Sequence, residues 1–185
     1  MTAAIPADST QAVVVYGAGV DDSTAAIAFY QKADGLWTQL ANWTGHNGKD
    51  GWVDVKHAED LRTPTGVFTL TDAGGKQPNP GSNLAYYHSS GFVAWGTGFD
   101  GESLAHAFDY VIAVNYNRVA GTSPLDETYP LGAARGGGVW LHVDHGGPTR
   151  SCVSLPRSGM VYLLRALKAA DHPVVVMGDR ADLAS

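Results

Sequence analysis

The segment GVWLHVDHGGPTRSCVSLP, from Gly138 to Pro156, combines a strand-like run with the one cysteine of the chain. In its first part apolar and polar residues alternate, which is typical of a half-buried strand. The alternation predicts that Leu141 and Val143 face one side, whereas His142 and Asp144 face the other. A Gly-Gly-Pro sequence then interrupts the run, so this segment predicts a β-rich fold with polar chemistry beside a turn.

A turn centred on Gly147 would fold the chain back antiparallel and place His142 opposite Cys152 and Asp144 opposite Arg150. The β-carbons of directly opposed residues lie about 4.5 to 5.5 Å apart, so an imidazole nitrogen reaches a thiol sulfur. A turn shifted by one residue would exchange the facing sets. Because a neighbouring histidine accepts the thiol proton, the spacing permits a Cys–His dyad.

Other interpretations of the same residues stay open. A lone cysteine in a folded domain is often a small buried hydrophobe without chemistry. His142, Asp144 and His145 are residue types that bind zinc, but the alternation places His145 on the opposite face of the strand, and we expect no metal. The chain has no G-x-S-x-G sequence, which disfavours a serine hydrolase of that type.

The composition predicts one mostly β domain. The chain has 185 residues, of which 44% are hydrophobic, 16% are charged and 23 are glycine. We expect residues 1–10 to form an N-terminal tail and residues 11–185 to form the domain. The net charge of −6 comes without a basic run, which disfavours nucleic acid as a partner. No apolar stretch reaches the length of a membrane span, and the first ten residues do not look like a signal peptide.

Apolar runs of strand length predict the elements of this domain. Met160, Leu163, Leu164 and Leu167 follow Pro156 at helical spacing, which predicts one main helix after the cysteine. The runs interpreted as strands lie within residues 11–19, 23–45, 50–57, 66–72, 91–98, 110–117, 136–145 and 172–179. We expect the first two runs to form a hairpin or a meander.

The sequence LHV…GGPTRSCVSLP and the helix after it resemble the catalytic segment of the L,D-transpeptidase (YkuD-type) family, especially its secreted actinobacterial members. Upstream, AEDLRTPTGVFTL (58–70) is similar to the family's acidic segment and Thr-Pro-x-Gly sequence, and YVIAVNYNR (110–118) is similar to its strand that ends in Tyr-Asn. QAVVVYG and GHNGKDGW also fit the family's opening strands and glycine-rich turn. The resemblance covers most of residues 11–179 in the right order.

The resemblance implies a β-sandwich-like catalytic domain that cross-links the peptide stems of peptidoglycan through a cysteine acyl-enzyme, without metal or cofactor. Cys152 matches the nucleophile and His142 matches the general base, and backbone N–H groups around Ser151 and Cys152 would stabilise the oxyanion. An amine of a second stem completes transpeptidation, whereas water gives L,D-carboxypeptidase activity. Carbapenems would acylate the cysteine. We expect a monomer in the cell wall or periplasm, exported by a signal that was removed.

Residues outside the dyad would bind the substrate. Arg150 and Arg157 could hold a carboxylate through bidentate hydrogen bonds, and Tyr116, in the family's Tyr-Asn pair, could shape the pocket. Packing and ordinary ion pairs are alternative roles for all three. An aromatic group could line a groove for glycan or peptide, although a strand core is its more common role. That group comprises Tyr86, Tyr87, Phe92 and Trp95.

The chain also departs from the family pattern. The widespread form is Ser/Thr-His-Gly-Cys-x-Arg/Asn, whereas this chain reads Thr-Arg-Ser-Cys-Val-Ser from Thr149 to Ser154. Two further functions therefore stay open. One is a catalytically impaired module of the same fold that binds cell-wall peptidoglycan, and the other is a cysteine amidase or peptidase with another substrate.

Overall fold

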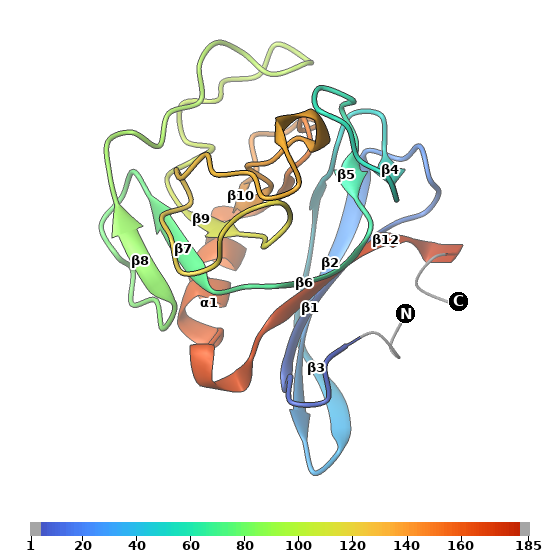
Figure 1. Cartoon of the computed structure of the whole chain (residues 1–185), viewed down its shortest axis with the longest axis vertical. Coiled ribbons are helices and arrows are strands. Elements are labelled where there is room, and N and C mark those ends of the chain that lie inside the picture. Colours follow the sequence, from blue (N-terminus) through green and yellow to red (C-terminus); the bar gives the residue numbers. More distant parts are fainter. Residues whose placement is uncertain (1–4, 182–185) are drawn as a thin grey trace.

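The computed structural model describes residues 5–181, and the fold begins with an antiparallel meander. Strands β1 (Gln11–Gly17), β2 (Thr24–Ala33) and β3 (Leu36–His46) follow one another, as the sequence predicts. Asp34 and Gly35 join β2 to β3 with positive φ angles of 51° and 79°, which suits a tight hairpin turn. Strand β12 (Val174–Asp179) returns from the end of the chain to lie parallel to β1 (Figure 1).

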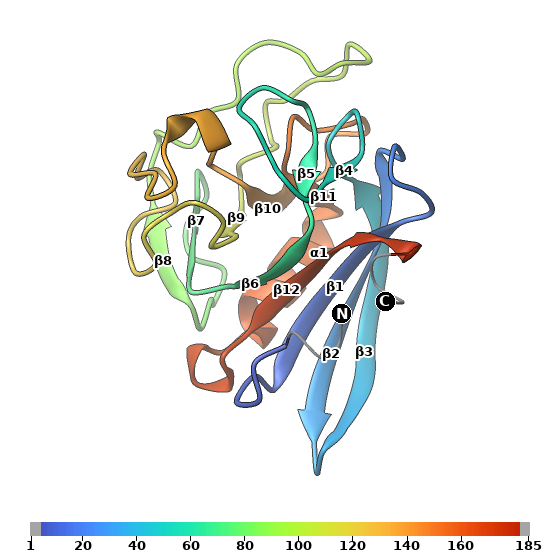
Figure 2. The same ribbon diagram turned by 45° about the vertical axis from the view of Figure 1, so that its right-hand side comes forward.

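The ten main strands form one curled sheet. Their order is β6-β12-β1-β2-β3-β11-β10-β9-β7-β8, and the two halves meet where Ser154 of β11 pairs with His46 of β3. Figure 2 shows β12, β1, β2 and β3 side by side, with β7 and β8 on the far side of the molecule. The remaining strands of this sheet are β6 (Gly66–Thr69), β7 (Asp72–Gly75), β8 (Ala85–His88), β9 (Val111–Ala113), β10 (Trp140–Val143) and β11 (Val153–Leu155).

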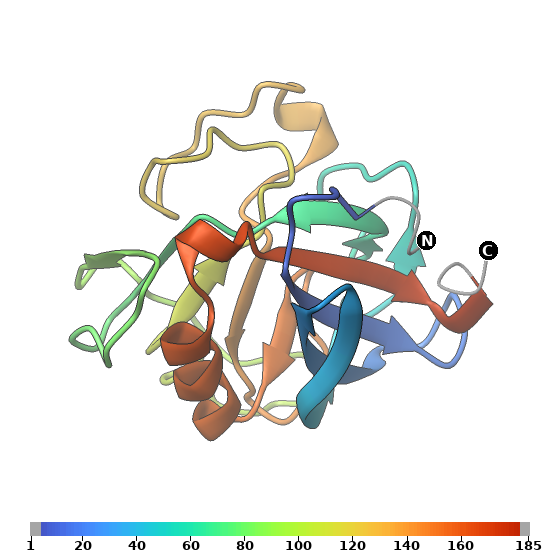
Figure 3. The same cartoon turned by 90° about the horizontal axis from the view of Figure 1, so that it is seen from below.

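Helix α1 (Arg157–Ala166) starts directly after Pro156, whose φ of −52° is already close to the helical value. Its buried side chains complete a core that both halves of the sheet share, and its position against the sheet is seen from below in Figure 3. This core includes Val13, Val15, Ile27, Phe29, Ile112, Leu141, Leu155, Met160, Leu163 and Leu164. The predicted mostly β fold with a helix after the cysteine is therefore confirmed.

The predicted hairpin around Gly147 is wrong, because β10 and β11 run parallel. Leu141 pairs with Val153, so the chain between the two strands must cross over instead of turning back. On its way from β10 to β11 the chain passes beside the segment that follows β3. There the Thr149 N–H donates to Asn47 O (2.9 Å), and the Lys49 N–H donates to Thr149 O (2.9 Å). These backbone contacts between distant segments carry no local sequence signal.

Two other predictions differ from the structure. Residues 91–98 are not a strand, because the chain turns there: the Gly98 N–H donates to Glu102 O at 2.8 Å. Between the predicted strands 50–57 and 66–72 lies the short strand β5 (Thr63–Pro64), which pairs with β4 (Trp52–Val53). Of the predicted tail 1–10, residues 1–4 lie outside the described residues, and the Thr10 N–H bonds to Asp171 O.

Short 3-10 helices complete the chain at η2 (Ala133–Arg135) and η3 (Ala169–Asp171). Among the described residues, no helix has the length and apolar character needed to cross a membrane. This agrees with the prediction of no membrane-spanning helix.

Candidate active site

A cavity of about 590 Å³ opens at the start of β10, and both members of the predicted dyad line it. A cavity of this size is typical of sites for small molecules and peptide segments. Its lining comes from the loops 94–108, 124–129 and 148–152 and from β10 with the residues around it. It includes Cys152, His142 and His145, with Phe108 and Trp140 among its aromatic members.

Cys152 is partly exposed and lies just before β11, beside Trp140 of β10. Its Sγ accepts a hydrogen bond from the Trp140 N–H (3.4 Å) and donates one to Gly138 O (3.5 Å). Burial raises the pKa of the Cys152 thiol to about 11, although the Trp140 N–H and the charge of Lys56 oppose that rise. The cysteine is therefore a protonated thiol at neutral pH.

His142 projects from β10 on the same face as Trp140 and is 3% exposed. Its Nδ1 lies 2.9 Å from Val143 O, so Nδ1 carries the proton and Nε2 remains as an acceptor. Burial lowers the pKa of His142 to about 4. The ring is thus neutral at physiological pH, the form that a general base requires.

No hydrogen bond joins Cys152 to His142 in this structure, because the thiol donates to Gly138 O instead. The two residues share a cavity through parallel neighbouring strands rather than through the predicted hairpin. A neutral thiol beside a neutral imidazole cannot act as a preformed thiolate–imidazolium pair. Any attack by the sulfur from this resting state would have to be accompanied by transfer of the thiol proton.

The loop before Cys152 is fixed by two threonines. Thr149 Oγ1 donates to Cys152 O at 2.7 Å, and Thr63 Oγ1 donates to the same oxygen at 3.3 Å. Ser151 lines the cavity and has no positive φ, so its side chain causes no backbone strain where the family has glycine. Ser151 makes no hydrogen bond to any described residue, which leaves its backbone N–H available to a ligand.

Asp144 does not pair with Arg150, which was the prediction. Its Oδ1 lies 2.8 Å from His46 Nδ1 and 2.5 Å from Ser154 Oγ, and it lies outside the cavity. Hydrogen bonds from Ser154 and His46 outweigh desolvation and lower the pKa of Asp144. This carboxylate therefore ties the two halves of the sheet together where β3 meets β11.

The predicted substrate-binding residues separate in the structure. Arg150 is exposed and lines the cavity, with no ion pair to any described residue. Arg157 lies outside the cavity lining, where it pairs with Asp109 and stacks on the Tyr110 ring. Its guanidinium is therefore held by these two contacts at the start of α1 and does not line the cavity.

Tyr116 is also outside the cavity. It is 7% exposed, packs in the core and donates from its hydroxyl to Arg135 O (2.9 Å). Its neighbour Asn117 bonds to Gly132 O, to Gly136 O and to the Leu131 N–H. The Tyr-Asn pair therefore positions the loop that leads to Gly137 and Gly138 at the cavity wall.

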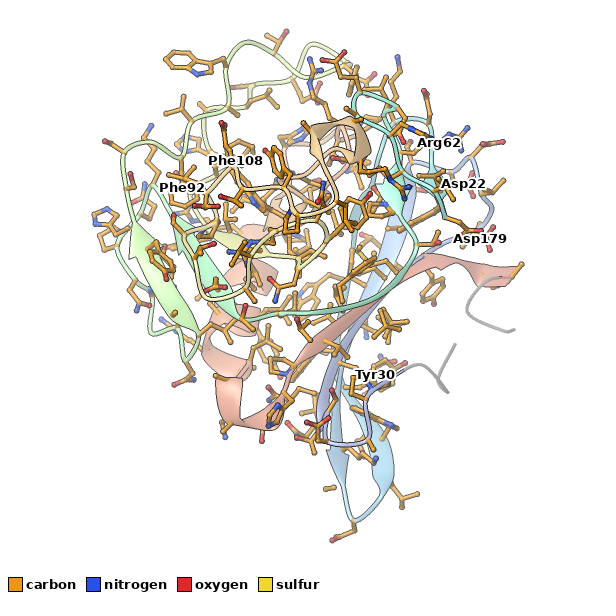
Figure 4. All side chains as sticks on the ribbon, in the orientation of Figure 1. Asp22, Tyr30, Arg62, Phe92, Phe108 and Asp179 are labelled. Atoms are coloured by element: carbon orange, nitrogen blue, oxygen red, sulfur yellow. The ribbon has the colours of Figure 1, made fainter. Side chains whose placement is uncertain are left out.

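The predicted aromatic groove is partly present. Phe92 and Phe108, both labelled in Figure 4, flank Trp140 with ring centroids 5.8 and 5.0 Å from it. Phe92 is buried, whereas Trp95 lines the cavity and is 86% exposed. Tyr86 and Tyr87 are absent from the lining.

Sequence reasoning missed the pair formed by His145 and Glu102. His145 Nδ1 lies 2.9 Å from Glu102 Oε1, and the His145 ring is parallel to that of His142 with centroids 5.6 Å apart. His145 therefore lies with His142 in the cavity and not on the opposite face, because β10 ends at Val143 and its alternation stops there. The described residues form no group of three or more histidine, cysteine and acidic residues arranged for a metal ion.

Comparison with known proteins gives a fold but no family. No protein-family model matches the chain, and no curated protein matches it. Among solved structures, Bd1075 of Bdellovibrio bacteriovorus is similar, with a TM-score of 0.53 and 14% sequence identity. The alignment covers 92% of this chain and 48% of that chain, so this chain spans about half the length of Bd1075. At this identity the likeness concerns the fold alone.

Proposed function

We propose that the chain is a cysteine acyltransferase of the L,D-transpeptidase type that acts on the peptide stems of peptidoglycan. One observation carries the proposal: Cys152 and His142, which match that family's nucleophile and base, line one cavity although ten residues separate them in sequence. The mostly β fold with α1 directly after the cysteine segment agrees with what the resemblance implies. The finer L,D-transpeptidase fold is part of the same proposal.

In the proposed acylation, Cys152 attacks the carbonyl carbon at the L-to-D junction of a tetrapeptide stem. His142 Nε2 takes the thiol proton as the carbon–sulfur bond forms, because both groups are neutral at rest. The backbone N–H of Ser151 stabilises the oxyanion. The carbon–nitrogen bond then breaks, and the terminal D-residue leaves as an amine.

In the second half, an amine of another stem attacks the thioester and forms the cross-link, whereas water would give a shortened stem. Arg150 suits the carboxylate of either stem, since its guanidinium is exposed at the cavity without a protein counter-ion among the described residues. The substrate would place the protein in the cell wall or periplasm. No cofactor is part of the proposal.

A second candidate function rests on the raised pKa of the Cys152 thiol. A thiol whose pKa is about 11 is poorly nucleophilic, which suits a module that binds peptidoglycan without reacting. A third candidate keeps the dyad but changes the substrate to another amide. Acylation chemistry separates the first candidate from the second, and stem-peptide cleavage separates it from the third.

The proposal is tested by exposing the purified chain to meropenem and measuring its intact mass. We expect one covalent adduct on the wild type, none on Cys152→Ala and much slower formation on His142→Gln. His106→Gln is the matched control, because His106 is exposed and lies outside the cavity lining. A wild type without adduct, or an adduct that survives Cys152→Ala, would contradict the cysteine mechanism.

A further inference from the structure

A second imidazole lies beside the proposed base. The rings of His142 and His145 are parallel within 10°, and both line the cavity that holds Cys152. The side chain of His145 is 6% exposed, so it is ordered by the protein while it still faces the cavity. His145 therefore shares one cavity with Cys152 and with the proposed base.

The partner of His145 is a carboxylate that the fold holds in place. Glu102 Oε1 lies 2.9 Å from His145 Nδ1, and Glu102 Oε2 accepts the Asp100 N–H at 2.9 Å. Gly98 and Gly147 leave the space that this carboxylate occupies, since a β-carbon on either would lie 1.8 or 2.4 Å from Glu102 Oε1. Hydrogen bonds from backbone N–H groups, its own first, lower the pKa of Glu102.

The two imidazoles therefore differ in their partners. His142 Nδ1 meets the neutral carbonyl of Val143, whereas His145 Nδ1 meets an ionised carboxylate. The carboxylate orients the His145 ring through Nδ1 and leaves Nε2 free for a substrate, whereas a backbone carbonyl orients His142. Paired titratable groups in such contrasting surroundings are typical of an acid and a base that act together.

We propose that His145, oriented by Glu102, is a second catalytic residue that protonates the departing amine, while His142 removes the thiol proton. The inference rests on the proposed function, of which it specifies the proton transfers. Glu102 is a positioning residue, because its carboxylate holds the His145 ring and does not line the cavity.

The proton balance closes over one acylation. The thiol proton moves from Cys152 Sγ to His142 Nε2 as the carbon–sulfur bond forms. The carbon–nitrogen bond breaks, and its nitrogen takes the proton from His145 Nε2. In the second half, the attacking amine gives a proton to His145, and the released thiolate recovers its proton from His142. Each turnover therefore returns both histidines to their starting forms.

The test compares two reactions of the same thiol in the full chain. Acylation by meropenem breaks a carbon–nitrogen bond and needs an acid, whereas alkylation by iodoacetamide releases iodide and needs none. We expect His145→Gln to slow acylation about 100-fold or more and to leave alkylation within about twofold. Glu102→Gln keeps a hydrogen-bond acceptor without the charge, so we expect it to slow acylation about 10-fold. His106→Gln, at an exposed histidine that pairs with Asp109, is the control.

Each outcome decides the inference. Acylation by His145→Gln at the wild-type rate, or an equal fall in acylation and alkylation, would overturn the role of His145. A wild type that meropenem acylates but that leaves stem peptides intact would refute the peptidoglycan function and leave the role of His145 standing. A wild type that meropenem does not acylate would overturn both.

Discussion

The burial of His142 links its protonation to the stability of the fold. In the unfolded chain a histidine has a pKa near 6.5, and burial lowers the pKa of His142 to about 4. The folded state therefore holds fewer protons than the unfolded state between these values. The stabilisation that comes from a neutral His142 is therefore fully present above pH 6.5. As the pH drops towards 4, the free energy of unfolding falls by about 3 kcal/mol in total.

Urea denaturation at pH 7.5, 5.5 and 4.5 measures this loss. His142→Gln removes the titrating ring, so the free energy of unfolding of the variant should fall less over the same pH range. Parallel pH profiles for wild type and variant would show that His142 is not the group responsible.

The Cys152 thiol should ionise at a higher pH than a free cysteine. Burial raises its pKa to about 11, so the rate of alkylation by iodoacetamide should continue to rise beyond pH 10. The alkylation rate of a small thiol with an ordinary pKa of about 8.5 levels off near pH 10 and serves as the control. A plateau below pH 9 for the protein would indicate a thiolate that the surroundings stabilise, and would contradict the neutral resting pair.

At the scale of elements, the crossover between β10 and β11 determines where the cysteine lies. Thr149 is 4% exposed, and its hydroxyl holds the carbonyl of Cys152. Thr149→Val keeps the shape of the side chain but removes the hydrogen bond. We expect the free energy of unfolding to fall by about 1 to 2 kcal/mol.

The loss in Thr149→Val should be accompanied by slower acylation of Cys152, because the loop before the nucleophile loses one of its two anchors. Thr38→Val is the control, since Thr38 is exposed on β3 and its hydroxyl makes no hydrogen bond to any described residue. Urea denaturation and acylation rates measure both variants. Equal unfolding free energies and equal acylation rates for the two variants would contradict the anchoring role of Thr149.

The elements that sequence predicts best are those with local signals. The meander of β1 to β3, the helix after Pro156 and the strand β12 follow from periodicity, turn residues and proline, and all are present. The orientation of β11 relative to β10 depends on the contact of Thr149 with Asn47, a hundred residues away in sequence. Local reasoning therefore predicted that His142 and Cys152 lie close together, and both line one cavity, but it joined them by the wrong connection.

The same limit explains the site residues that were misplaced or missed. The resemblance pointed to Cys152 and His142, and the structure brings both to one cavity. The Glu102 partner of His145 lies 43 residues away, between the predicted strands 91–98 and 110–117, where the sequence predicted no element. Tyr116 lies in the core because its strand faces inwards, which no motif distinguishes from a pocket.

In the molecule as a whole, buried ion pairs hold the long loops against the curled sheet. Arg118 and Asp72 form a 3.0 Å ion pair with side chains only 4% and 1% exposed. Arg118→Met leaves a buried carboxylate without its cation, and we expect the free energy of unfolding to fall by about 3 to 5 kcal/mol.

The control for Arg118→Met is Asp21→Asn, which breaks the exposed pair with Arg62 at a side chain that is 76% exposed. An exposed pair contributes at most about 1 kcal/mol, so this variant should unfold close to the wild type. Urea denaturation of both variants measures the difference. Equal losses of unfolding free energy in the two variants would show that burial does not make the Arg118–Asp72 pair more stabilising than an exposed pair.

The proposed function requires that Cys152 forms an acyl-enzyme with a peptide stem. Purified tetrapeptide muropeptides should be incubated with the chain, and the released terminal D-amino acid and the intact protein mass should be followed together. We predict release of the D-residue with a transient stem adduct on Cys152, and neither with Cys152→Ala. No release by the wild type, or release that persists in Cys152→Ala, would contradict the account.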